Sequence, residues 1–108
     1  MSVEMKTTGE VLTAYLSGEL DHHTAVAMRN QIDSSIELNM PTMLILDFSG
    51  ITFMDSSGIG LIMGRYRVLS KSGAKLHISG VTPQIYKVMK LAGLERLSVL
   101  DETSIINR

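Results

Sequence analysis

The segment 43–64, with the sequence MLILDFSGITFMDSSGIGLIMG, decides the fold of this chain. It opens with an unbroken apolar run at 43–46, which is typical of a central strand covered on both faces. We expect a loop over 49–55. Apolar residues then recur at every third or fourth position over 59–69. This spacing predicts an amphipathic helix, which Gly73 closes in a left-handed cap.

Upstream of this segment, a strand-like pattern is followed by a helical one. Apolar and polar residues alternate over 3–6 and again over 11–16, with turn residues between the two stretches. We therefore expect an antiparallel hairpin. Apolar residues recur every three or four positions over 25–36, which predicts an amphipathic helix. Asp21 supplies its N-cap, and Pro41 ends it because proline lacks the N–H that a continuing helix needs.

Downstream, alternation over 75–79 predicts another strand. Thr82, which is followed by a proline, opens a third helix, and Gly93 stops it. We expect a short last strand over Leu97 to Leu100.

Asp101 is predicted to cap a helical tail that contains Ile105 and Ile106. The resulting order of elements is β-β-α-β-α-β-α-β plus this tail. Such an order predicts an α/β protein with a mixed β-sheet that opens with an antiparallel hairpin and has helices packed on it.

The composition indicates a single globular domain over residues 1–108. Hydrophobic residues make up 44% of the chain, and 10 basic residues against 11 acidic ones give a net charge of -1. No overall positive field is available for nucleic acid or an anionic membrane, so we expect neither as a partner. Cysteine is absent from the sequence, and no apolar stretch is long enough to span a membrane. We expect a cytoplasmic protein.

The segment with the most chemical information is Phe53 to Gly60, between the buried strand and the second helix. A helix N-terminus presents unpaired N–H groups and a positive dipole end, which stabilise an exposed anion by roughly 0.3–1 kcal/mol. Ser56 or Ser57 could carry such an anion. The alternative is that Asp55 and the two serines only cap the helix, although capping and modification are compatible.

Three sharper motifs fail at this segment. A dinucleotide-binding fingerprint needs a third glycine, but Met63 occupies that position. A phosphate-binding P-loop needs a lysine, but Gly64 is followed by Arg65 and lacks the required spacing. A nucleophile elbow needs a glycine two residues before the serine, where Met54 or Asp55 stands.

The histidines do not indicate a metal site. His22 and His23 are adjacent, so they cannot face one ion from successive helical turns. We expect both to be exposed in the first turn of the first helix, and we expect no metal ligands in this chain. A small serine hydrolase would need His22, His23 or His77 as its base, and we keep that hypothesis as an alternative.

Two segments resemble the STAS domain family of anti-sigma factor antagonists and sulfate transporters. They are Gly18 to Ala25 (GELDHHTA) and Phe53 to Gly60 (FMDSSGIG), and the second continues through Gly64-Arg65-Tyr66. The resemblance is strongest to the sporulation anti-sigma factor antagonists and extends over almost the whole chain in element order. The tail after Asp101 is shorter than the family's usual final helix.

This resemblance implies a regulatory switch without catalytic activity of its own. The unmodified protein would bind an anti-sigma factor that is also a serine kinase, which frees the sigma factor for transcription. The kinase would bind the ATP, so no cofactor is expected in this chain. Phosphorylation would fall on Ser56, which directly follows Asp55, and a serine phosphatase would restore binding. The expected partner-binding residues are Glu19, Asp21, His22, Asp55, Ser57, Gly58, Ile59 and Gly60.

A phosphate on Ser56 adds a charge of about -1.5 to -2 next to a helix N-terminus, where the free protein tolerates it. Repulsion and desolvation would act at the interface with a partner instead. The alternative with the same fold is a STAS module that senses or scaffolds without phosphorylation, for example by binding a nucleotide.

Overall fold

The computed structural model describes residues 2–106 of the chain. The strands and helices are β1 (Ser2–Thr8), β2 (Val11–Leu20), α1 (His22–Asn39), β3 (Met43–Met54), α2 (Ser56–Ser70), β4 (Lys75–Ser79) and α3 (Pro83–Leu91). Two short 3-10 helices follow, η1 (Leu94–Leu97) and η2 (Glu102–Ser104).

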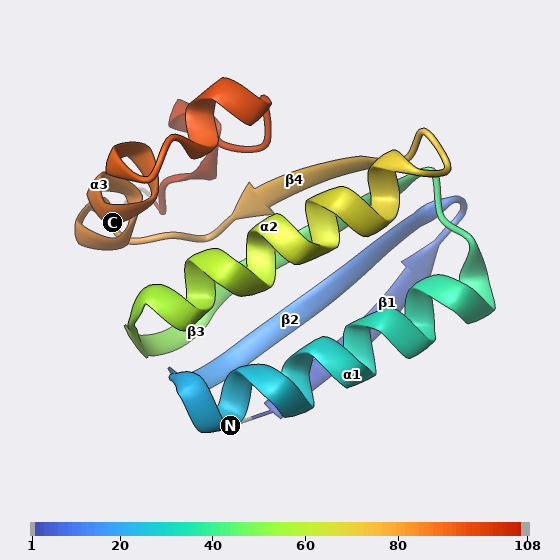
Figure 1. Cartoon of the computed structure of the whole chain (residues 1–108), viewed down its shortest axis with the longest axis horizontal. Helices are drawn as coiled ribbons and strands as arrows, with labels where there is room; N and C mark the ends of the chain where they lie inside the picture. Colours follow the sequence, from blue (N-terminus) through green and yellow to red (C-terminus); the bar gives the residue numbers. More distant parts are fainter. Residues whose placement is uncertain (1, 107–108) are drawn as a thin grey trace.

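The strands form one mixed sheet in the order β1-β2-β3-β4 (Figure 1). β1 and β2 pair antiparallel, and Gly9 makes the turn between them with a φ of 60°. β2, β3 and β4 run parallel, because α1 and α2 each carry the chain back across the sheet. The predicted fold class, a mixed sheet that opens with a hairpin, is confirmed.

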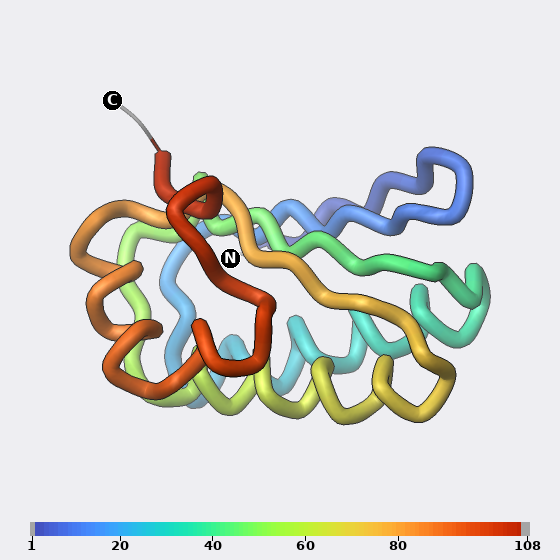
Figure 2. The backbone as a smooth tube through the Cα atoms, turned by 90° about the horizontal axis from the view of Figure 1, so that it is seen from above, coloured from blue at the N-terminus to red at the C-terminus, as the bar shows by residue number. Residues whose placement is uncertain are grey.

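Helices α1 and α2 lie side by side on one face of the sheet (Figures 1 and 2). The fully buried residues of β2 and β3 alternate along each strand, and so they share this face. The core residues that meet between the sheet and these helices are Leu12, Ala14, Leu16, Leu44, Leu46, Phe48, Met28, Ile32 and Ile62. Residues 43, 45 and 47 alternate with buried ones and are only half-buried. The expectation that this strand is covered on both faces is wrong.

The predicted ends of α1 and the predicted start of α3 are confirmed, because local capping sets them. Asp21 caps α1, which ends at Asn39, and Met40 adopts a left-handed conformation (φ 45°) just before Pro41. Thr82 caps α3 by accepting a hydrogen bond of 3.2 Å from the N–H of Ile85.

The predicted left-handed cap of α2 at Gly73 is wrong. α2 ends at Ser70 and its C-cap Lys71 is right-handed, while Gly73 (φ 77°) lies in the turn that follows.

The predicted loop over 49–55 is wrong, because β3 continues to Met54 and β2 to Leu20. The two strands stay paired through register shifts near Ser17 and Gly18. At Gly50 they come so close that a Cβ would lie 2.8 Å from the Leu16 carbonyl oxygen. This pairing is a tertiary contact that no local hydrophobic pattern announces.

The predicted strand over Leu97–Leu100 is also wrong. Ser98 has a left-handed φ of 61°, which reverses the chain where a strand would need extended backbone. Val99 still contacts the edge of the sheet, since its carbonyl accepts a 2.9 Å hydrogen bond from the N–H of Ile78.

The predicted helical tail is reduced to the 3-10 helix η2. Asp101 caps it through the N–H of Thr103 at 2.8 Å, as expected of a capping residue. Ile105 and Ile106 lie beyond this helix, and Ile105 forms a parallel bridge with Val81.

Candidate functional site

The two segments that carry the family resemblance meet at one end of the sheet. In the parallel register of β2 and β3, Glu19 lies opposite Phe53 and Leu20 opposite Met54. The N–H of Asp55 donates a 3.2 Å hydrogen bond to the carbonyl of Leu20. Both strands therefore end together, and α1 and α2 begin side by side (Figure 1).

Asp21 fixes the start of α1 through a capping box. Its carboxylate accepts hydrogen bonds from the N–H groups of His23 (2.9 Å) and Thr24 (3.0 Å). The Thr24 hydroxyl accepts from the N–H of Asp21 and donates to the Glu19 carbonyl at 2.7 Å. The hydrogen bond from the Thr24 N–H lowers the pKa of Asp21 below its ordinary value of 3.8. Asp21 is therefore a fixed negative charge at this edge.

Asp55 has the corresponding position at the start of α2. Its carboxylate accepts a 2.8 Å hydrogen bond from the N–H of Ser57. Ser56 is consequently the first residue of the helix, and Ser57 is the second. The capping role is thus carried by Asp55, which leaves the serine hydroxyls available for other chemistry.

The Ser56 side chain is exposed. Within residues 2–106, its hydroxyl forms no hydrogen bond to another side chain or to the backbone. A hydroxyl in this position can be esterified without unfolding the helix, and the product would lie at the positive end of the α2 dipole.

Other predicted partner-binding residues surround Ser56 with different exposures. Glu19 and His22 are exposed, and His23 is exposed beside His22, as expected. Gly60 is also exposed, whereas Ile59 is half-buried and packs against the core.

Gly58 is buried, and internal packing explains its glycine. A Cβ there would overlap the side chain of Met54 and lie 3.1 Å from Cδ2 of Leu20. Because Gly58 has no side chain, the first turn of α2 packs directly against the ends of β2 and β3. A contact between Gly58 and a partner stays a prediction.

The sequence interpretation missed Phe53 as a surface residue. Its side chain is 51% exposed and lies opposite Glu19 in the strand register, next to the Ser56 end of α2. An exposed aromatic ring at this edge suits a protein interface, where aromatic residues are enriched. The stretch FMDSSG, which contains Phe53, was visible in the sequence. Because we expected a loop there, the sequence did not tell us which of its residues face outward.

The arrangement gives little support to metal or hydrolytic chemistry. Within residues 2–106, no group of three histidine, aspartate or glutamate side chains could hold a metal ion. In the same part of the chain, neither Ser56 nor Ser57 is hydrogen-bonded to a histidine, the contact that activates a serine nucleophile. None of the described helices is long and apolar enough to cross a bilayer.

Comparison with protein families agrees with this geometry. The model of the STAS domain matches residues 2–104. The chain belongs to the STAS domain family.

Among STAS proteins, this chain is similar to several named regulators. It is 32% identical over 105 residues to an anti-sigma F factor antagonist of Paenibacillus polymyxa, covering 97% of this chain and 90% of that one. It is 37% identical over 87 residues to an anti-sigma F factor antagonist of Lysinibacillus sphaericus, covering 81% of this chain and 74% of that one.

Two solved structures extend the likeness to three dimensions. The unphosphorylated form of the anti-sigma factor antagonist SpoIIAA matches with a TM-score of 0.78 at 33% identity, covering 89% of this chain and 84% of that one. The phosphorylated form of SpoIIAA, a Bacillus cell fate determinant, matches with a TM-score of 0.71 at 33% identity and covers 89% and 87%.

Proposed function

We propose that this STAS protein is an anti-sigma factor antagonist that is switched off by phosphorylation of Ser56. In its unmodified form it binds an anti-sigma factor serine kinase and so releases the sigma factor. Relatives named anti-sigma F factor antagonist, one of them similar over 97% of this chain, support the general role. A relative solved in unphosphorylated and phosphorylated forms supports the switch.

The observation that carries the proposal is the exposed Ser56 hydroxyl at the first position of α2. It is accessible to a kinase active site, and it lies on the same edge as Glu19, Asp21 and Phe53. A partner that covers this edge would have to cover Ser56 as well. The modified residue would then be inside the interface.

The negative charges near Ser56 make partner binding sensitive to a phosphate on this residue. Asp21 and Asp55 already place two carboxylates at the starts of the neighbouring helices. A phosphate adds a further charge of about -1.5 to -2 and additional volume. Within the free protein the helix N-terminus offsets that charge, but a close-fitting partner must desolvate it. A loss of ~3 kcal/mol at the interface would weaken binding more than a hundredfold.

The chemistry is supplied by the partners. The kinase binds ATP and transfers its γ-phosphate to the Ser56 oxygen, and a serine phosphatase hydrolyses the ester and restores binding. This chain needs no cofactor for either step and acts in the cytoplasm, where transcription takes place.

The proposal is tested by incubating the chain with its cognate anti-sigma factor kinase and ATP and mapping the modified peptide by mass spectrometry. We expect one phosphate on Ser56. The matched pair Ser56→Ala and Ser57→Ala changes neighbouring hydroxyls, and only Ser56→Ala should abolish labelling. Partner binding without any modification would favour the sensing or scaffolding alternative, and labelling that follows Ser57 would contradict the assignment.

A further inference from the structure

The outer edge of β1 is open. β1 is the first strand of the sheet, so β2 pairs with it on one side, and within residues 2–106 no strand pairs with it on the other. Its pairing with β2 is continuous from Ser2 to Thr8, and the strand contains no proline. An uncovered strand edge presents N–H and C=O groups that a further strand can bind. The open edge of β1 is therefore a template for pairing.

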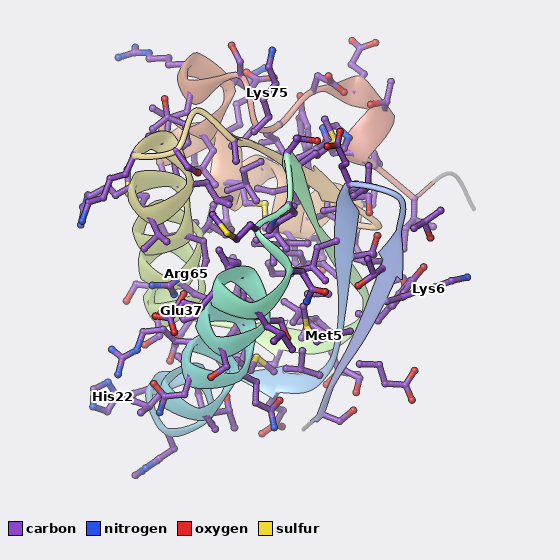
Figure 3. The ribbon with its side chains drawn as sticks, turned by 90° about the vertical axis from the view of Figure 1, so that its right-hand side faces the viewer. Met5, Lys6, His22, Glu37, Arg65 and Lys75 are labelled. Atoms are coloured by element: carbon purple, nitrogen blue, oxygen red, sulfur yellow. The ribbon has the colours of Figure 1, made fainter. Side chains whose placement is uncertain are left out.

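The charges of β1 are arranged symmetrically about Met5, the middle residue of the strand. Glu4 and Lys6 flank it, and both side chains are exposed. In Figure 3 Met5 lies between α1 and the sheet, whereas Lys6 points away from α1. Within their own sheet, Glu4 lies opposite Tyr15 and Lys6 opposite Thr13. Neither charge therefore has an oppositely charged neighbour on the adjacent strand.

This charge pattern is complementary to itself in one register. If a second copy of β1 pairs antiparallel with Met5 opposite Met5, then Glu4 lies opposite Lys6 of the second copy, and Lys6 lies opposite its Glu4. All seven residues of the strand are paired in this register. A symmetric pairing centred on Glu4 or on Lys6 instead would place like charges opposite each other. Opposite charges across a strand pair stabilise it, and like charges destabilise it.

A groove of about 400 Å³ follows this edge between β1 and α1. β1 contributes the apolar side chains of Val3 and Met5 to it. α1 contributes only uncharged polar side chains, which are those of Asn30, Gln31, Ser34 and Ser35. With Met5 opposite Met5, the grooves of the two copies would meet at the two-fold axis. No charge in this groove would have to be desolvated.

The charged residues of α1 lie away from this edge. Arg29 lines the space between α1 and α2, and Asp33 forms its ion pair with α2. Glu37 lines a pocket together with the turn that follows α2. By helical periodicity, Leu38 continues the β1 side of the helix one turn beyond Ser34, and it is 84% exposed. The flank that a second copy would approach is thus uncharged and includes an exposed apolar side chain.

We propose that this protein forms a symmetric homodimer in which two β1 strands pair antiparallel through their outer edges, with Met5 at the two-fold axis. The two four-stranded sheets would form one continuous sheet, with the helices of both copies on the same face (Figure 2). Main-chain hydrogen bonds would provide affinity, and the pairs of Glu4 with Lys6 would set the register. The same surface is used by both copies, so the assembly closes at two chains.

The dimer would leave the proposed partner-binding edge open. β1 lies at the side of the sheet, whereas Asp21 and Asp55 follow the ends of β2 and β3. Each dimer would therefore present two Ser56 hydroxyls to its partners. Dimer formation does not depend on the proposed function, and it can be measured with this chain alone.

The test is sedimentation velocity of the unmodified full chain at increasing concentrations up to about 1 mM. We expect the mass to rise from that of one chain to that of two. Glu4→Lys should raise the dissociation constant by about tenfold or more, because two attractive cross-strand pairs become repulsive. Glu10→Lys makes the same change of charge in the exposed turn after β1 and should leave the constant unchanged.

An exchange of the two charges separates cross-strand pairing from a general effect of charge. Glu4→Lys combined with Lys6→Glu restores opposite charges across the axis, and we expect the dissociation constant to return to within about threefold of the natural value. A chain that stays monomeric over the whole range, or a double variant that dimerises as weakly as Glu4→Lys, would overturn the proposal. Because no kinase is present, that result would leave the assignment of Ser56 unaffected.

Discussion

Two aspartates of this protein have the same role, which is to cap the N-terminus of a helix. Asp21 and Asp55 each follow a parallel strand and accept the first free N–H groups of a helix. Each helix therefore begins directly at the end of the sheet, without a connecting loop. Because Asp55 supplies the cap, Ser56 occupies the first helical position with its hydroxyl free, so one short motif contains both the cap and the hydroxyl that we propose is phosphorylated.

The Asp21 cap should make the stability of the fold dependent on pH. Its folded-state pKa is lowered below 3.8, so its contribution is present above that value and is lost as the pH falls through the folded pKa. Asp21→Asn retains a capping oxygen but cannot titrate. Chemical denaturation from about pH 5 to about pH 2 should show the variant losing less unfolding free energy than the natural chain. Equal losses would contradict the assigned cap.

Residue-level features were the most predictable ones. The caps Asp21 and Thr82 are visible in the sequence because they act on N–H groups within three positions of themselves. Phe53 was not predictable as a surface residue, because its exposure depends on how far β3 pairs with β2. The Asp33–Arg65 pair was missed for the same reason, since it joins two different helices.

At the scale of elements, local periodicity predicted the helices better than the strand ends. Helix boundaries follow from local capping, whereas β3 runs eight residues past the apolar stretch 43–46 because β2 remains beside it up to Leu20. The stretch 97–100 has strand-forming residues, yet the left-handed Ser98 turns the chain. Strand ends are therefore set by pairing and by backbone reversals that the hydrophobic pattern does not reveal.

Two glycines of α2 should respond in opposite directions to alanine. Gly58→Ala forces a methyl group against Met54 and Leu20, and such overpacking is expected to cost about 1–3 kcal/mol. Gly60→Ala meets open space and should stabilise the helix by about 0.5–1 kcal/mol. Equilibrium unfolding in urea measures both. Destabilisation by Gly60→Ala would show that the glycine has a structural role.

The ion pair between Asp33 and Arg65 links α1 to α2. Asp33 is 34% exposed and Arg65 is 6% exposed, so removal of the carboxylate leaves a buried cation only partly accessible to water. We expect Asp33→Ala to cost about 1–3 kcal/mol. A double-mutant cycle with Arg65→Met should give a coupling energy of about 1 kcal/mol. A coupling energy near zero would mean that the interaction between the two charges does not stabilise the fold.

At the scale of the whole molecule, the proposed partner-binding edge lies at one end of the sheet, whereas the core extends along the sheet. Parallel β2 and β3 bring together the segments 18–25 and 53–60, which are far apart in sequence. The family resemblance predicted partner-binding residues in these two segments, and the parallel order of the strands explains why the segments meet.

This separation of site and core predicts that the switch leaves the fold intact. Ser56→Asp places a carboxylate in the first turn of α2, where the helix dipole favours it, so the unfolding free energy should change by less than about 1 kcal/mol relative to Ser56→Ala. Thermal unfolding followed by circular dichroism makes the comparison. A large cooperative loss of stability in Ser56→Asp would mean that modification acts by unfolding.

The most direct test of the switch is the affinity of the anti-sigma factor kinase for this chain before and after phosphorylation of Ser56, measured by calorimetry. We predict tight binding of the unmodified chain and a dissociation constant more than about a hundredfold higher for the modified one. Equal affinities for the two forms would contradict the proposed role of Ser56.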